Sequence, residues 1–228
     1  MEAEKENECE FSAQLKELES DADQASWYIG FLKATVDNPD VCDRLNGSIC
    51  GHAGVVARAG AKNSVILYCN RAWDEGHDVI SLPKVMKILP GLEVLEARKR
   101  DRLDRALDAE DKQCLSSSLE CLKAKYVAIS ACPERAAFRV LRSEWLAHRI
   151  IGSRDRVNAE KADLNVDGAT YDDLLRFAEG TASLVGQLRY LWDQKVDPYP
   201  DKIEYATCIA REFWRLIPVL KDVEAGNY

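Results

Sequence analysis

The stretch ECEFSAQLKELESDADQASWYIGFLKAT, residues 8–35, decides the fold class. Its apolar residues recur every three or four positions, as they do on one face of an α-helix. They are Phe11, Leu15, Leu18, Ala22, Ala25, Tyr28, Ile29 and Leu32. The segment DNPD at 37–40 follows as a stop signal. The spacing therefore predicts one long helix over 8–35.

Helical spacing continues outward from this stretch through most of the chain. Further helices are expected over about 41–74, 82–90, 92–131, 134–151, 171–195 and 202–223, with Ser81 and Thr170 at N-cap positions. Strict alternation of apolar and polar residues is scarce, and there is neither an internal repeat nor a Gly/Ser linker. We therefore predict an all-α bundle of about six to seven helices. It forms one domain over 1–228, with a core of about 41–196 on which helices 8–36 and 202–223 pack.

Composition narrows the protein class. Hydrophobic residues make up 46% of the 228, which is enough for a core and excludes wholesale disorder. A net charge of -8 excludes a general binder of polyanions. No run of eighteen apolar residues occurs, residues 1–10 hold five Glu and one Lys, and the eight cysteines form no Cys-x-x-Cys pair. We expect a cytoplasmic protein with no membrane contact, metal or cofactor.

Positive charge is concentrated in one segment. Residues 133–156 contain six Arg and no Lys against three acidic residues, so this window is +3 and the rest of the chain is -11. On a helix, Arg135, Arg139, Arg142 and Arg149 fall within one arc, beside an apolar arc. A guanidinium binds phosphate oxygens through two parallel hydrogen bonds, which Lys cannot do. The segment therefore predicts an arginine ridge that binds phosphate groups.

A histidine follows this ridge. His148 lies six residues after Arg142, and on one ideal helix their side chains diverge by roughly 120°. Both can reach one atom only if the helix bends or a partner chain supplies one of them. Glu144 lies four residues before His148, where it can orient the imidazole and favour its protonated form. An imidazole beside a phosphate-binding guanidinium is the minimal set for metal-free phosphodiester cleavage.

Four segments together resemble a known superfamily. They are RSEWLAH at 142–148, ILYCNRAWD at 66–74, SLPKV at 81–85 and TYDDL at 170–174. The first is similar to the Arg-x(4–6)-His signature of the HEPN superfamily (higher eukaryotes and prokaryotes nucleotide-binding). The other three resemble its abortive-infection type U branch. The resemblance covers most of residues 45–195.

The resemblance implies a helical bundle that forms a homodimer, with two Arg-His motifs facing each other across a cleft, and metal-independent RNA cleavage. Arg142 would stabilise a phosphorane-like transition state, and His148 would serve as acid or base around the ribose 2′-hydroxyl. Ser143 occupies a position that is polar in the family, and a catalytic role for Glu144 is our inference. We expect Arg135, Arg139 and Arg149 to bind RNA. Phage defence or a toxin-antitoxin pair, with an antitoxin protein as a possible partner, is the implied setting.

Three alternatives remain open at this point. The arginines can form a solvated face paired with acidic residues of helix 8–35, or the motif can serve a dimer interface alone. The cleft can also bind RNA, a nucleotide or a partner protein without cutting. A second basic window, Arg98–Arg105, is either an ion-paired helix face or another wall of an RNA cleft. Asn70, Arg71 and Asp74 are either a buried network that supports the motif or an exposed turn of helix.

Overall fold

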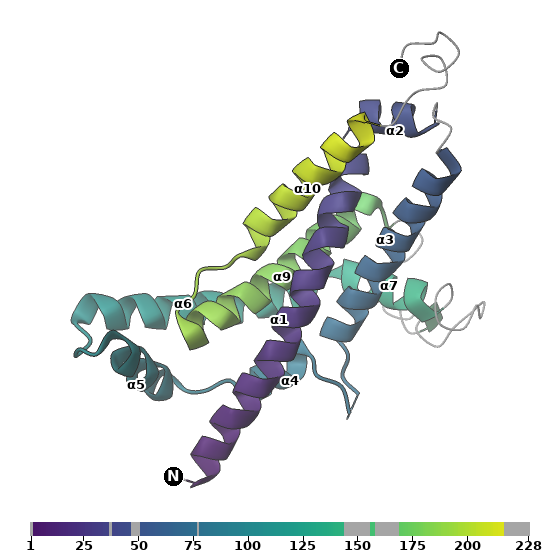
Figure 1. Ribbon diagram of the computed structural model, residues 1–228. Coiled ribbons are helices and arrows are strands. Elements are labelled where there is room, and N and C mark those ends of the chain that lie inside the picture. Colours follow the sequence, from purple (N-terminus) through teal and green to yellow (C-terminus); the bar gives the residue numbers. More distant parts are fainter. Residues whose placement is uncertain are drawn as a thin grey trace.

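The computed structural model describes residues 2–36, 38–46, 51–76, 78–143, 156–157 and 169–216 (Figure 1). All regular elements in these residues are helical, which confirms the all-α class. The labelled helices are α1 (Glu2–Val36), α2 (Pro39–Asn46), α3 (Gly51–Ala72), α4 (Leu82–Lys87), α5 (Leu92–Leu103), α6 (Ala109–Ser130), α7 (Pro133–Leu141), α9 (Tyr171–Asp193) and α10 (Tyr199–Arg215).

The long helix α1 runs through the centre of the bundle (Figure 1). Its predicted apolar stripe is buried from Phe11 to Leu32, apart from the partly buried Tyr28, and packs with α3, α9 and α10 in one continuous core. Gly30 permits a close approach to α10, because a Cβ there would lie 2.5 Å from the Cβ of Ala206. The segment that predicted the fold class therefore carries most of the packing.

The single helix predicted over 92–131 is wrong. Asp104 adopts a left-handed conformation (φ 50°, ψ 35°) that ends α5, and Asp108 caps α6 by accepting a hydrogen bond from the Asp111 N–H at 2.8 Å. The two helices then pack against each other. No Gly or Pro stands between Leu103 and Ala109, so the sequence carries no strong break signal at this turn.

Other predicted boundaries differ less. The helix expected over 41–74 corresponds to α2 and α3, and Trp73 and Asp74 follow the end of α3. The Thr170 cap is confirmed, because its side chain and that of Asp173 form a reciprocal capping box at the start of α9. Ser81 stands at the N-cap of α4, but its buried hydroxyl makes no capping hydrogen bond.

Within the described ranges, no helix combines the length and the apolar character that crossing a bilayer requires.

Candidate functional site

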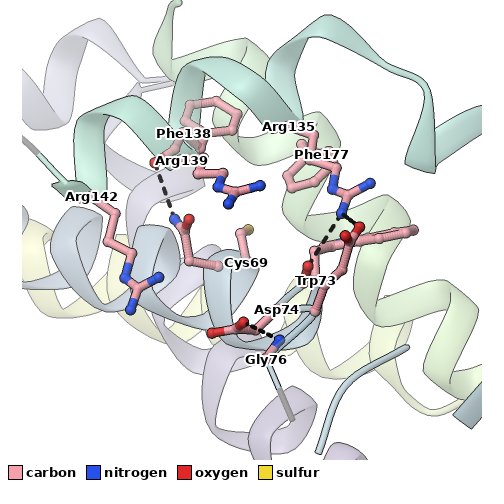
Figure 2. Close-up of a pocket in the computed structure, with 11 residues that line it drawn as sticks. Cys69, Trp73, Asp74, Gly76, Arg135, Phe138, Arg139, Arg142 and Phe177 are labelled. Atoms are coloured by element: carbon pink, nitrogen blue, oxygen red, sulfur yellow. Dashed lines mark hydrogen bonds and ion pairs between the residues drawn. The ribbon is translucent and has the colours of Figure 1, made fainter. Parts of the chain in front are cut away.

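The arginine ridge begins on α7, which packs against α3 and α9. Pro133 occupies the first turn of α7, where its missing N–H is not needed, and Phe138 and Val140 bury the apolar face. The arginine face beside Phe138 borders a pocket of about 300 Å³ between α7 and the end of α3 (Figure 2). Its lining consists of Cys69, Asn70, Trp73, Asp74, Glu75, Gly76, Arg135, Phe138, Arg139, Arg142 and Phe177.

Arg135 is bound within the protein on one wall of this pocket. Its guanidinium donates to Glu75 Oε1 at 2.6 Å, to the Trp73 carbonyl at 3.3 Å and to the Ser130 carbonyl at 3.2 Å. It also lies 5.2 Å from the centre of the Trp73 ring. The hydrogen bond from Arg135 lowers the pKa of Glu75, so this carboxylate stays charged. Arg135 therefore ties α7 to the segment that follows α3.

Arg139 and Arg142 line the same pocket from successive turns of α7 (Figure 2). Arg139 is exposed and Arg142 is partly buried. The helix changes at this point, because the Arg142 N–H is shared between the carbonyls of Phe138 and Arg139, and residues 142–143 adopt a π-helical turn. Such turns break the regular phase of a helix and are frequent at functional sites.

Asn70 connects α3 to this turn. Its Nδ2 donates to the Ile66 carbonyl at 2.8 Å and to the Phe138 carbonyl at 3.1 Å. The Phe138 carbonyl is one of the two that the Arg142 N–H shares. For Asn70, these two hydrogen bonds favour the supporting network over an exposed turn of helix. Arg71 is exposed and pairs with Asp21 on α1 at 3.1 Å.

Comparison with known proteins identifies the family of the chain. The HEPN_AbiU2 family model, described as AbiU2, matches residues 8–213. The chain belongs to this HEPN family. The resemblance seen in the sequence is thereby confirmed, and α7 with its pocket lies inside the matched region. No curated protein and no solved structure matches the chain.

The predicted motif residues of this HEPN protein are only partly described. Arg135, Arg139 and Arg142 come together at the pocket, and Ser143 follows them in the π-helical turn. Glu144, His148 and Arg149 lie outside the described residues, so the relation between Arg142 and His148 stays a prediction. Glu75 is the pocket residue that the sequence did not point to, because its contact with Arg135 joins positions 60 apart in the chain.

The pocket floor is apolar. Trp73, Phe138 and Phe177 are almost fully buried and pack their rings against one another. Beside them, burial raises the pKa of the Cys69 thiol far above its ordinary value, so this sulfur is neutral. Among the residues that the structure describes, no three His, Cys, Asp or Glu side chains gather as metal ligands. The polar chemistry of the pocket thus comes from guanidinium groups, carboxylates and one amide.

In the second basic window, residues 98–105, the cations are bound by carboxylates within the protein. Arg98 lies 3.7 Å from the centre of the Trp192 ring and donates to the Trp192 carbonyl at 3.0 Å. Every cation of this window has a carboxylate oxygen within 3.5 Å: Arg98 and Arg102 pair with Asp193, Lys99 and Arg105 with Asp111, and Arg100 with Asp101. These contacts favour the ion-paired helix face over a second wall of an RNA cleft.

Proposed function

We propose that this HEPN protein is a metal-independent endoribonuclease that acts through Arg142 and His148. The observation that carries the proposal is the position of Arg142, which lines a polar pocket at a π-helical turn inside the matched family region. A guanidinium held by its backbone beside a pocket can stabilise charge that develops on a phosphate oxygen. Phage defence or a toxin-antitoxin pair is the setting that the family supports.

The proposed reaction is an internal transesterification. The ribose 2′-oxygen attacks the neighbouring phosphorus, its proton passes to a base, and the 5′-oxygen leaves with a proton from an acid. His148 fills one of these two roles and Arg142 stabilises the charged transition state. The products are a 2′,3′-cyclic phosphate and a 5′-hydroxyl end. Glu144 would orient His148, while Ser143, Arg139 and Arg149 would contact the strand.

A homodimer completes this proposal. Two Arg-His motifs that face each other would place the +3 windows of two chains in one cleft, surrounded by acidic surfaces. The acidic surroundings would confine RNA to the cleft, because phosphate groups are repelled elsewhere. An antitoxin protein that covers the cleft would be the natural partner of such a toxin.

The test is cleavage of RNA by the purified protein in EDTA. We expect cyclic-phosphate products, and a loss of at least about 100-fold in rate for Arg142→Ala and for His148→Ala. Arg215→Ala serves as the matched control, because Arg215 is an exposed arginine at the end of α10, outside the pocket. Its rate should equal that of the unaltered protein.

Two results would contradict this function. The first is an absence of cleavage over a range of RNAs, and the second is cleavage that both Arg142→Ala and His148→Ala retain. A different outcome is salt-dependent binding of RNA without cleavage, with an affinity that His148→Ala leaves unchanged. That result would make the cleft a binding site without catalysis.

A further inference from the structure

The orientation of the Asn70 amide decides what this side chain offers to the pocket. An amide nitrogen has two protons, and the Asn70 Nδ2 directs them at two carbonyls, those of Ile66 and Phe138. Exchanging Nδ2 and Oδ1 would set an oxygen against two carbonyl oxygens, so this orientation is fixed. Oδ1 is therefore left as a hydrogen-bond acceptor on a side chain that lines the pocket.

Asp74 adds a second acceptor. Its Oδ1 accepts a hydrogen bond from the Gly76 N–H at 2.8 Å, which holds the carboxylate in a tight turn after α3 (Figure 2). Oδ2 remains available, because the hydrogen bonds found in the described part of the chain involve Oδ1 alone. The neighbouring Glu75 differs, since its carboxylate is bound by Arg135.

The two sides of the pocket therefore have opposite character. Arg142 offers donors at the end of α7, while Asn70 and Asp74 offer acceptors from the end of α3. A bare phosphate does not match this arrangement, because Asp74 would repel it. A nucleotide does match, since its phosphate accepts hydrogen bonds and its base can donate them.

Guanine matches the acceptor side of the pocket best among the four RNA bases. Its N1–H and N2–H₂ groups are adjacent donors to a carboxylate or an amide oxygen. Adenine and cytosine each present one amino group, and uracil presents one N–H. The cavity of about 300 Å³ and its apolar floor suit a planar base turned out of a single strand.

We propose that the pocket between α3 and α7 binds one nucleobase of the RNA, next to the phosphate held by Arg142, and that Asn70 and Asp74 select guanine there. This inference rests on the proposed function, because it names the nucleotide that the same site reads. It makes Asp74 a specificity-determining residue whose effect depends on the base.

The test compares nucleotides that differ by one group. Guanosine 3′-monophosphate and inosine 3′-monophosphate differ only in the N2 amino group, so their affinities for the full-length protein, measured by calorimetry, isolate the predicted contact. We expect guanosine monophosphate to bind about tenfold more tightly than inosine monophosphate, and the adenosine and uridine analogues to bind no better than inosine monophosphate. This comparison uses the unaltered protein and does not depend on the folding of a variant.

Asp74→Asn then tests whether Asp74 makes the contact with the N2 amino group. This substitution keeps the size of the side chain and replaces one acceptor oxygen by a donor. We expect the guanosine-to-inosine ratio to fall to about one. Asp172→Asn, an exposed carboxylate on α9 outside this pocket, is the matched control and should keep the full ratio. Equal affinities for all four nucleotides, or a ratio that Asp74→Asn leaves unchanged, would overturn the inference.

The outcomes separate this inference from the proposed function. RNA cleavage without preference for guanine at the cut would refute base selection and leave the ribonuclease intact. Asp74-dependent binding of guanosine monophosphate by a protein that cleaves no RNA would refute the ribonuclease and leave base selection intact.

Discussion

Two basic windows of this chain have the same net charge in the sequence and different environments in the structure. Residues 98–105 and residues 133–156 are each +3. In the first window all five cations have carboxylate partners, mostly Asp111 on α6 and Asp193 on α9. In the second, Arg135 pairs with Glu75, while Arg139 and Arg142 line a pocket.

This difference shows that tertiary partners, more than local charge, decide how an arginine is used. Most cations of the first window pair with carboxylates on the helices against which α5 packs. These residues therefore contribute to the stability of the fold. In the second window, Arg135 is held by hydrogen bonds within the protein, and Arg139 and Arg142 border the pocket. Arg135, held by Glu75, and Arg142, which lines the pocket, are seven residues apart along the chain.

One Arg→Lys substitution in each window tests this distinction, and the largest effect is expected at Arg142. Arg142→Lys keeps the charge but loses the planar fork that binds two phosphate oxygens, so RNA cleavage should fall by about tenfold or more. Arg102→Lys keeps an exposed ion pair with Asp193 and should leave the cleavage rate unchanged. The measurement is the cleavage rate of each variant on one defined RNA. Equal rates for the two variants would contradict the distinction between the two windows.

The next effect concerns stability. Arg135→Ala removes three hydrogen bonds and the contact with the Trp73 ring, and only 22% of this side chain is exposed. We expect the free energy of unfolding to fall by about 2 kcal/mol. Arg100→Ala in the first window removes one exposed pair with the adjacent Asp101 and should cost less than about 0.5 kcal/mol.

Urea denaturation monitored by circular dichroism measures both changes. A loss for Arg135→Ala no larger than that for Arg100→Ala would mean that Arg135 does not hold α7 in place.

The sequence predicts the features of this fold that depend on neighbours along the chain. The apolar stripe of α1 and the Thr170 N-cap of α9 each involve residues within a few positions, and both are confirmed. The break between α5 and α6 was missed because it depends on the left-handed conformation of Asp104, which Asp adopts less readily than glycine.

The site could be predicted only in part, for a related reason. The ridge of Arg135, Arg139 and Arg142 follows from helical spacing, and the structure brings these residues to one pocket. The opposite side of that pocket depends on Asn70, whose partner Phe138 is 68 positions away. No local pattern encodes that contact, so the sequence marked Asn70 as unusual without showing what it binds.

A smaller effect uses pH to compare the two windows. The hydrogen bond from Arg135 lowers the pKa of Glu75, so the stability from this pair is complete above the usual glutamate pKa and is lost as pH falls through the lowered value. Glu75→Gln should therefore cost up to about 1 kcal/mol at pH 7, because the carboxylate is well exposed, and less at an acidic pH where the carboxylate becomes protonated.

The first window supplies the matched case. The hydrogen bond from Arg105 likewise lowers the pKa of Asp111, so Asp111→Asn should show the same direction of pH dependence. Unfolding in urea at the two pH values measures both variants. A cost for Glu75→Gln that persists at low pH would show that its charge contributes little.

The smallest effect concerns the turn that closes the first window. Asp104 has a φ of 50°, which glycine adopts without steric cost, so Asp104→Gly should raise the free energy of unfolding by about 0.5 kcal/mol. Gln194, at φ 52°, is the matched control, because its side chain donates to the carbonyls of Tyr190 and Leu191. Gln194→Gly gains the same backbone freedom but loses these hydrogen bonds, so it should be neutral or destabilising. Urea midpoints distinguish the two, and a gain of equal size at both positions would show that the Gln194 hydrogen bonds contribute nothing.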